Sequence, residues 1–436
     1  MDYKDKLITV DEALAKIPKK CSIVTGLGCS EAMDIMSNIH KIYDRIEHVE
    51  ITNCLPMGNY EFISEKYSDK FSINGWFYAP QLRKAHSNGN ISFIPNNLHF
   101  AGKKRFQHQK PDVYVGSAAM PDKHGYISLS MGNTYEMEAI SHADLVILEI
   151  NPNYPRTFGD HVLHISDVDF LIESDYKVPT IPSGESSEKD EKIGNYIAEY
   201  IEDGSCLQLG IGGIPNVVAK SLYKKKNLGI HTEMLTSEMA RLAKAGVING
   251  KELTIHKGQM MATFIMGDQE LYDFVDDNPG VVIAAGSYTN DPHVIGQIKN
   301  MISINTTMEV DIMGQCNSES IGPRQFSGSG GQSDTAIGAQ IGGGKSFIAL
   351  HSTAMVKNKE TGEREEVSKI VPFLAPGSAV TLSRNDVDYV VTEYGVAHLR
   401  GTTIRERVDK LIAIAHPKYR EWLYDEAVRL GIIGKR

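Results

Sequence analysis

The sequence has 436 residues, a mass of 48.2 kDa and a formal net charge of −10. This length exceeds what one hydrophobic core usually supports, so we expect two domains. A pI near 5.9 argues against a broad nucleic-acid-binding face, which depends on clustered Lys and Arg. The first residues lack the apolar core of a secretory signal, and no apolar stretch is long enough to cross a bilayer, so a cytoplasmic protein without membrane contact is predicted.

Cysteine and histidine give no sign of a metal site. The five cysteines are scattered and lack CxxC spacing, and the fifteen histidines show no HExxH or comparable ligand spacing. We therefore predict neither a disulfide framework nor a bound metal.

The first half of the chain opens with a β-loop-α-β pattern. Residues 21–26 form an apolar β-like run, a helical pattern follows and ends near residue 43, and residues 48–55 form a second β-like run. Residues 206–236 repeat this plan, with a helix that Pro215 opens. Two open α/β domains are therefore predicted.

A connector rich in Pro, Ser and charged residues spans residues 178–192 and leads into a helical pattern over residues 188–202. We place the domain boundary there, which gives an N-terminal domain of residues 1–185 and a C-terminal domain of residues 186–436.

A glycine-rich turn follows the β-like run at residues 206–209. Such a turn often serves only chain reversal and packing, but it can also let backbone N–H groups approach an anionic or polarised group. It matches neither the P-loop pattern nor the complete GxGxxG dinucleotide pattern. Both interpretations therefore stay open for Gly210, Ile211, Gly212, Gly213, Ile214 and Pro215.

A second glycine-rich stretch covers residues 326–347 and contains Gly330, Gly331 and Gln332. Ordering so many glycines costs chain entropy, so a closely approaching ligand or backbone is a reasonable cause. A purely structural turn is the competing interpretation.

Three polar residues are candidates for the chemistry. Glu233 follows a β-like run and stands about twenty residues after the first glycine turn, Asn317 offers an amide donor, and Glu393 lies at the end of another apolar run. Ligands of open α/β sheets bind beyond the carboxyl ends of the strands. Singly, each residue is more often a turn or solvated residue, but together they make a plausible site with one nucleophile, an amide donor and a second carboxylate.

These segments occur in an order and spacing that resemble the acetyl-CoA hydrolase/transferase family, and most closely its 4-hydroxybutyrate and butyryl-CoA:acetate CoA-transferase branch. The resemblance is carried by LQLGIGGIPNVV, LGIHTEM, VDIMGQCNSESIG, FSGSGGQSD and SRNDVDYVVTEYGVAHLRG, and more weakly by NGWFYAP and EINPNYPRTFGD in the first half. It therefore covers nearly the whole chain.

The resemblance implies a CoA-transferase that exchanges CoA between a short-chain acyl-CoA and a carboxylate such as acetate. In the family, the glutamate that Glu233 matches forms an acyl anhydride and then a glutamyl-CoA thioester. Asn317 matches an asparagine near the thioester carbonyl, Glu393 matches a site carboxylate, and the two glycine turns with Gln332 match segments that line the CoA or acyl pocket.

The resemblance also implies two similar α/β domains with the site in the cleft between them, a homodimer or larger oligomer, and no cofactor beyond coenzyme A. A hydrolase that uses water as acceptor is the main alternative. A non-catalytic CoA-binding protein is the other.

Overall fold

The computed structural model describes residues 2–182, 184–210, 212–357 and 361–435. Its internal contacts divide the chain into two compact units. Unit 1 contains residues 1–182, 232–240 and 259–291, and unit 2 contains residues 183–231, 241–258 and 292–436. The first change of unit falls close to residue 185, but the chain then returns to unit 1 twice, so the division is not the single cut expected from the sequence.

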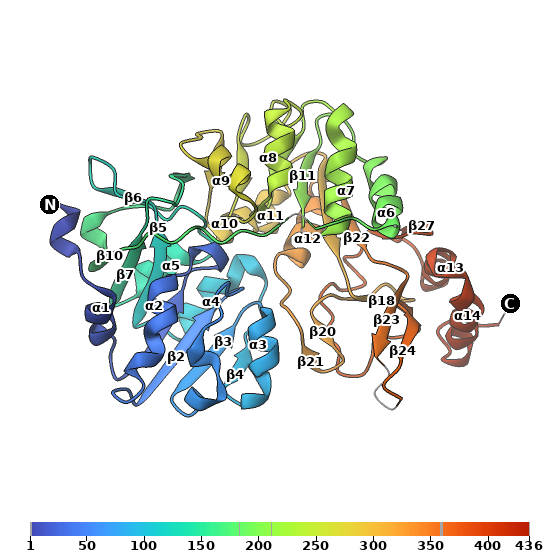
Figure 1. The fold of residues 1–436 in the computed structure, drawn as a ribbon. Helices are drawn as coiled ribbons and strands as arrows, with labels where there is room; N and C mark the ends of the chain where they lie inside the picture. Colours follow the sequence, from blue (N-terminus) through green and yellow to red (C-terminus); the bar gives the residue numbers. More distant parts are fainter. Residues whose placement is uncertain (1, 183, 211, 358–360, 436) are drawn as a thin grey trace. The chain divides into compact units, whose positions relative to one another are not determined.

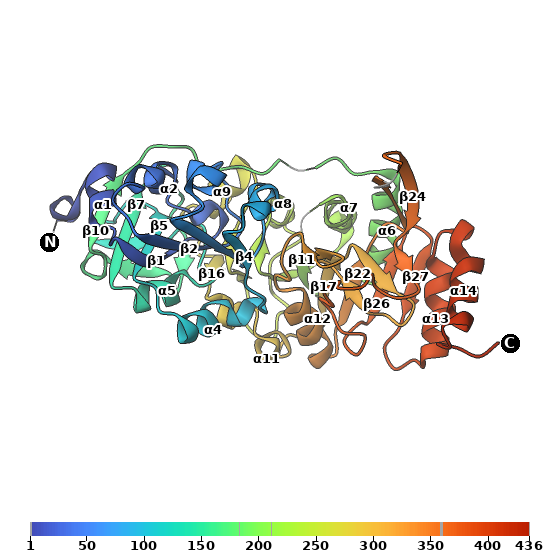
Figure 2. The ribbon, with the colours of Figure 1, turned by 90° about the horizontal axis from the view of Figure 1, so that it is seen from below.

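Unit 1 is built on a seven-stranded parallel sheet with strand order β10-β7-β5-β1-β2-β3-β4. Figure 2 shows helices α1 and α2 on one face of this sheet and α4 and α5 on the other. The strands are β1 (Lys20–Thr25), β2 (His48–Asn53), β3 (Phe71–Gly75), β4 (Ile91–Phe93), β5 (Val113–Ala118), β7 (Leu145–Ile150) and β10 (Phe170–Glu173), and the helices are α1 (Val10–Lys16), α2 (Met33–Asn38), α3 (Pro80–Ala85), α4 (Ala101–His108) and α5 (Glu136–His142).

The central strands of this sheet are apolar because helices cover both of their faces. Every residue of β5 is buried, and β1 and β2 contribute Ile23, Val49 and Ile51 to the main core cluster of the unit. The first β-loop-α-β pattern of the sequence is confirmed, with the expected helix present as α2 flanked by 3₁₀ turns.

Unit 1 also contains two smaller groups of strands. One is parallel in the order β14-β16-β8, and in the other β13 pairs with β15. Two short helices lie in the segment of residues 259–291, and β6 and β9 form a separate antiparallel pair. The elements are β6 (Tyr126–Ser128), β8 (Phe158–Gly159), β9 (Val162–His164), β13 (Met234–Leu235), β14 (Met260–Ala262), β15 (Phe264–Ile265), β16 (Val281–Ile283), α9 (Gln269–Val275) and α10 (Gly286–Thr289).

Unit 2 contains a parallel run of strands in the order β26-β22-β17-β11-β12, with β27 antiparallel to β26. Figure 2 shows α6 and α7 on one side of these strands and α12 on the other. The strands are β11 (Cys206–Leu209), β12 (Gly229–His231), β17 (Met301–Thr306), β22 (Lys345–Ala349), β26 (Tyr389–Thr392) and β27 (Gly395–His398), and the helices are α6 (Glu188–Ala198), α7 (Gly213–Ser221), α11 (Pro292–Ile295), α12 (Gln332–Ile341), α13 (Ile404–Ile414) and α14 (Arg420–Arg429).

Short strands complete the description. Unit 2 holds β18 (Glu309–Asp311), β19 (Cys316–Asn317), β20 (Ser320–Ile321), β21 (Arg324–Gln325), β23 (Thr353–Lys357), β24 (Arg364–Ser368) and β25 (Ile370–Val371). Helix α8 (Ser237–Lys244) begins in unit 1 and ends in unit 2. Figure 1 allows the chain to be followed from the first unit to α13 and α14 at its end.

Helix α6 begins where the sequence predicts a helix after the connector. Ser187 accepts a hydrogen bond from the backbone N–H of Asp190, and the Asp190 carboxylate accepts the Ser187 N–H in return, which makes a capping box.

The predicted α/β class and the two-domain organisation are both present in the structure.

Candidate functional site

Glu233 lies at a sharp connection in the chain. The predicted strand over residues 229–235 is in fact two short strands, β12 and β13, and Glu233 lies between them. Its backbone oxygen accepts the N–H groups of Thr263 and Phe264, each at 2.9 Å. Glu233 is a partly exposed residue whose backbone is held by these two hydrogen bonds.

Asn290 contacts the carboxylate of Glu233. The Asn290 side chain is fully buried at the C-terminus of α10, and its Nδ2 donates a hydrogen bond to Glu233 Oε2 at 3.2 Å. Sequence reasoning missed this residue. The two positions are 57 residues apart, and an Asn followed by Asp-Pro reads as an ordinary turn.

Buried acids also lie in this unit. Glu31 accepts hydrogen bonds from the Met57 N–H at 2.8 Å and from Tyr60 Oη at 2.9 Å, and burial raises its pKa to about 8. Burial, followed by the charges of Glu136, Glu233 and Glu31, raises the pKa of Cys54 well above its usual value. Cys54 is therefore a neutral thiol at neutral pH.

Unit 2 contains a groove of about 250 Å³ where its parallel strands end. The first glycine turn contributes Gly212, Gly213, Ile214 and Pro215 to its lining. The remaining lining residues end or directly follow β17 and β22, or lie in the first turn of α6; they are Thr306, Thr307, Ala349, Leu350, His351 and Asp190. Four of the six turn residues predicted to bind CoA or the acyl group therefore share one groove.

The glycines of this turn are required for different reasons. Gly212 has φ +116°, a conformation that side chains rarely adopt, and nothing lies within 4 Å of where its Cβ would be. At Gly213 a Cβ would lie 2.5 Å from Asp190 Oδ2. Gly210 follows β11 and its N–H donates to the Ile304 oxygen at 3.2 Å, whereas Ile211 lies outside the described residues.

A histidine and an aspartate line the groove together. His351 Nε2 donates a hydrogen bond to Asp190 Oδ1 at 2.8 Å. The hydrogen bonds from Ser187 and His351 outweigh the opposing effect of burial and lower the pKa of Asp190, so the carboxylate is ionised. Neither residue was predicted, since their contact joins positions 161 residues apart.

Glu393 follows β26, as predicted, and is firmly held. Its two oxygens accept the N–H and the hydroxyl of Ser352, both at 2.8 Å, and Lys189 Nζ lies 3.1 Å from Oε1. Burial alone would raise the pKa of this carboxyl. The hydrogen bonds from Ser352 and Lys189 have the larger combined effect, so the pKa of Glu393 is lowered. Glu393 is therefore an anion held in a fixed position. Its partner Ser352 is the residue directly after His351, which lines the groove.

Asn317 is fully buried and its amide is already engaged. Its Nδ2 donates to Glu309 Oε1 at 2.9 Å and to the Ser320 oxygen at 2.8 Å, and its Oδ1 accepts the Ser320 N–H at 3.0 Å. Donation to a thioester would require one of these bonds to be given up. Its backbone oxygen accepts the hydroxyl of Thr307, a groove residue, at 2.8 Å.

The second glycine stretch reaches the same groove through Gln332. Gly330 has φ +54°, Gly331 is the N-cap of α12, and the buried Gln332 donates from Nε2 to the oxygen of Thr306 at 3.2 Å. Among the described residues, Gly212 to Pro215 thus line the groove, Asn317 and Gln332 each bond to a lining residue, and Glu393 bonds to Ser352 beside the lining residue His351.

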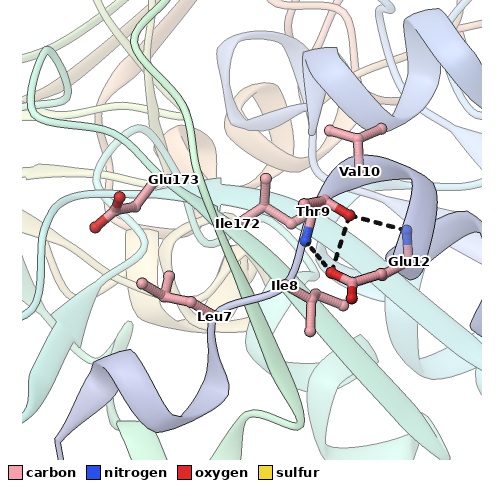
Figure 3. A pocket seen from close by; sticks show the side chains of 7 residues that line it. All are labelled: Leu7, Ile8, Thr9, Val10, Glu12, Ile172 and Glu173. Carbon is pink, nitrogen blue, oxygen red and sulfur yellow. Dashed lines mark hydrogen bonds between the residues drawn. The ribbon is translucent and has the colours of Figure 1, made fainter.

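Two other hollows carry less chemistry. Figure 3 shows one of about 370 Å³ that Leu7, Ile8, Val10 and Ile172 line, in which Thr9 and Glu12 bond to each other as the cap of α1. A second, of about 560 Å³, has Asp34, Glu173 and Asp175 in its wall. Within the described parts of the chain, no group of three or more His, Cys, Asp or Glu side chains is placed to hold a metal, and no helix has the length and apolarity to cross a membrane.

Comparison with protein families identifies the class. Residues 1–182 match the acetyl-CoA hydrolase/transferase N-terminal domain, and residues 267–427 match the C-terminal domain of the same family. The chain belongs to the acetyl-CoA hydrolase/transferase family.

Individual relatives resemble the chain over nearly its whole length. It is 42% identical to a 4-hydroxybutyrate coenzyme A transferase from Clostridium kluyveri, over 97% of each chain. It is 38% identical to a probable butyrate:acetyl-CoA coenzyme A-transferase from Syntrophomonas wolfei, over 99% of this chain and 97% of the relative. The crystal structure of RipA from Yersinia pestis superposes with a TM-score of 0.91 at 31% identity, covering 99% of this chain and 100% of RipA. The predicted family and the predicted enzyme class, CoA-transferase, are both confirmed.

Proposed function

We propose that this enzyme exchanges CoA between a short-chain acyl-CoA, 4-hydroxybutyryl-CoA or butyryl-CoA, and a carboxylate such as acetate. The observation that carries the proposal is Glu233: a glutamate in the family's H-[ST]-E-M segment, anchored through its backbone, with an accessible carboxylate that a buried amide orients. The names of the relatives from C. kluyveri and S. wolfei support these substrates.

The proposed chemistry needs only a carboxylate and coenzyme A. Glu233 attacks the carbonyl of the acyl-CoA, the carbon–sulfur bond breaks, and a mixed anhydride forms as the CoA thiolate leaves. The thiolate then attacks the glutamyl carbonyl, the donor acid leaves, and a glutamyl-CoA thioester remains. An acceptor carboxylate reverses the sequence, so the energy of the thioester is conserved.

Other parts of the chain support particular steps. A glutamate carboxylate can act as a nucleophile without a general base. The groove lined by Gly212 to Pro215 is our candidate for the CoA-binding surface, because holding CoA between steps makes the return attack effectively intramolecular. A donor role of Asn317 toward the thioester, assembly as a homo-oligomer, a cytoplasmic location and the absence of any cofactor beyond CoA stay predictions.

The decisive experiment traps the intermediate. The protein is mixed with acetyl-CoA without acceptor, reduced with borohydride, which converts a glutamyl thioester into an alcohol, and digested for peptide mass spectrometry. We expect modification of Glu233 alone, its reversal by prior addition of acetate or butyrate, and complete loss in Glu233→Gln.

Glu238→Gln provides the matched control, because Glu238 lies five residues further along, in the first turn of α8. This variant should be trapped as the wild type is. Steady release of CoA with unmodified Glu233 would instead indicate hydrolysis with water as acceptor. Tight binding without exchange or trapping would indicate a CoA-binding protein.

A further inference from the structure

Two loops that follow neighbouring strands of unit 1 are bonded to each other. One loop follows β1 and the other follows β2, and these strands are adjacent in the parallel sheet. The Gly28 N–H donates to the backbone oxygen of Cys54 at 3.1 Å, and the Met57 N–H donates to Glu31 Oε2 at 2.8 Å. Loops at the carboxyl ends of parallel strands are where open α/β sheets bind their ligands.

Three buried side chains at these loops carry polar atoms that have no hydrogen-bond partner among the described residues. The atoms are Oγ of Ser30, Oε1 of Glu31, and both Oδ1 and Nδ2 of Asn53, which is the last residue of β2. Most buried polar atoms in folded proteins are hydrogen-bonded, because burying an unpaired one destabilises the fold. Four such atoms on two bonded loops therefore indicate a functional requirement. We call Ser30, Glu31 and Asn53 the polar cluster.

The polar cluster is connected to the segment that holds Glu233. Ser30 Oγ lies 3.4 Å from the position that a Cβ of Gly132 would occupy, and Gly132 forms a β-bridge with Phe264. The Phe264 N–H in turn donates to the backbone oxygen of Glu233 at 2.9 Å. One end of the cluster is therefore two contacts away from the backbone of Glu233.

Electrostatic effects also place Glu31 close to Glu233. After burial, the charges of Glu136, Glu233 and Glu31 are what raise the pKa of the Cys54 thiol, so all three carboxyls lie near one buried atom. Cys54 directly follows Asn53 in the chain. We therefore expect an acyl chain held at Glu233 to extend toward the polar cluster.

The chemistry of the polar cluster fits an uncharged group that both donates and accepts. Asn53 supplies a donor and an acceptor, and Ser30 Oγ can be either. Burial raises the pKa of Glu31 to about 8, so its carboxyl is protonated at neutral pH. Because Oε2 already accepts from the Met57 N–H and from Tyr60 Oη, the proton is available as a donor on Oε1.

A hydroxyl group matches this mixture of donors and acceptors. A methyl group would leave the same atoms unpaired, and a carboxylate would bring a charge into a buried site. A site built to bond a hydroxyl also rejects the analogue that lacks it, since the buried polar groups of the site are then unsatisfied.

We infer that the polar cluster binds a hydroxyl group on the acyl chain and so makes the enzyme select hydroxyacyl groups over unsubstituted ones. The inference rests on the proposed function. It decides between the two acyl groups named there, in favour of 4-hydroxybutyryl over butyryl. The three residues determine specificity and take no part in the bonds that form and break at Glu233.

The first test compares two substrates on full-length enzyme. The kcat/KM is measured for 4-hydroxybutyryl-CoA and for butyryl-CoA, with acetate as acceptor, in the wild type and in Asn53→Leu. The variant removes both polar atoms at similar volume, and the Asn53 side chain gives up no hydrogen bond to the described residues. We expect the wild type to prefer 4-hydroxybutyryl-CoA by at least about 10-fold, and the preference to fall by about 10-fold in the variant. The loss should be confined to the hydroxylated substrate.

A second variant and a control accompany this test. Ser30→Ala removes one hydroxyl and adds no volume, so it should fold and should also lower the preference for 4-hydroxybutyryl-CoA. Asn278→Leu makes the same substitution elsewhere in unit 1, at an amide whose Nδ2 donates to the Phe274 oxygen at 2.9 Å. This control should retain the wild-type ratio of the two kcat/KM values.

Each outcome has a defined meaning. If the wild type uses both substrates equally, or prefers butyryl-CoA, the inference is overturned and the proposed function stands. If Asn53→Leu does not fold, or loses activity equally on both substrates, Ser30→Ala decides, and an unchanged ratio in that variant overturns the inference. If the wild type transfers CoA from neither substrate to acetate, the proposed function itself fails.

Discussion

Glu31 shows how burial can make the charge state of one residue control stability. Its side chain is fully buried, and burial raises its pKa from 4.5 to about 8. The folded protein therefore keeps this proton between pH 4.5 and 8, whereas the unfolded chain loses it. Because the folded state then binds more protons, the free energy of unfolding contributed by Glu31 decreases as pH rises through this window.

Glu31→Gln should remove this dependence. The amide cannot ionise, and its oxygen can still accept from Met57 and Tyr60. Relative to wild type, we expect the variant to gain stability between pH 5 and pH 8, by an amount on the order of a few kcal/mol. Urea unfolding at both pH values measures this. If the free energy of unfolding changed equally with pH in the two proteins, the prediction would be contradicted. Burial also raises the pKa of Glu149, to about 7, but this residue contributes a similar pH dependence to both proteins, so its effect cancels in the comparison.

Residues that bear chemistry were predictable where the chain itself marks them. Glu233 and Glu393 follow apolar β-like runs, and the structure places both at strand ends. Asn290 and His351 were not predictable, because their partners Glu233 and Asp190 are 57 and 161 residues away. Only the fold brings such pairs together.

At the scale of elements, the start of α7 depends on its contact with the start of α6. Gly213 leaves space for the Asp190 carboxylate, which also caps α6 and binds His351. The glycine turn was interpreted as either packing or ligand approach, and the structure shows that packing accounts for Gly213. Because Gly213 and Asp190 both line the groove, their contact also shapes the groove.

Gly213→Ala should therefore weaken the binding of acyl-CoA. Its Cβ would lie 2.5 Å from Asp190 Oδ2, so the carboxylate and His351 must shift at the groove. We expect a raised KM for acyl-CoA in steady-state kinetics. Gly184→Ala is the control, since nothing lies within 4 Å of its Cβ position. An unchanged KM in Gly213→Ala would show that the groove does not bind CoA.

The strands illustrate what periodicity can and cannot predict. The apolar runs of β1, β2 and β11 were located from the sequence because buried parallel strands are continuously apolar. The run at residues 229–235 was predicted as one strand but is two, separated at Glu233. The interruption at Thr232 and Glu233 leaves the hydrophobic pattern of the run unchanged. It coincides with the hydrogen bonds that the N–H groups of Thr263 and Phe264 make to the Glu233 oxygen, and these partners are distant in the sequence.

At the scale of the whole molecule, the chain alternates between its two units. Unit 1 is incomplete without residues 232–240 and 259–291, which supply β16, the partner of β8, and Phe264, which bridges to Gly132. The composition of the connector near residue 185 revealed the first change of unit, but nothing in local composition marks the later ones.

A fragment of residues 1–185 should therefore be less stable than the corresponding part of the full chain. It lacks β16, the strand that pairs with β8, and the other strands of residues 232–240 and 259–291. Urea unfolding followed by circular dichroism should give a lower midpoint for the fragment than for the full-length protein. Equal midpoints would show that the first segment is a self-sufficient domain.

The alternation also determines when the enzyme can fold during synthesis. Domains generally fold as they leave the ribosome, the N-terminal one first. Here unit 1 cannot be completed until residue 291 has emerged, and the first part of unit 2, up to residue 231, must wait for the segment that begins at residue 292. Glu233 and its amide partner Asn290 are thus joined only after most of the polypeptide has been made. Until then, the nascent chain holds the seven-stranded sheet of unit 1 without the later segments of that unit.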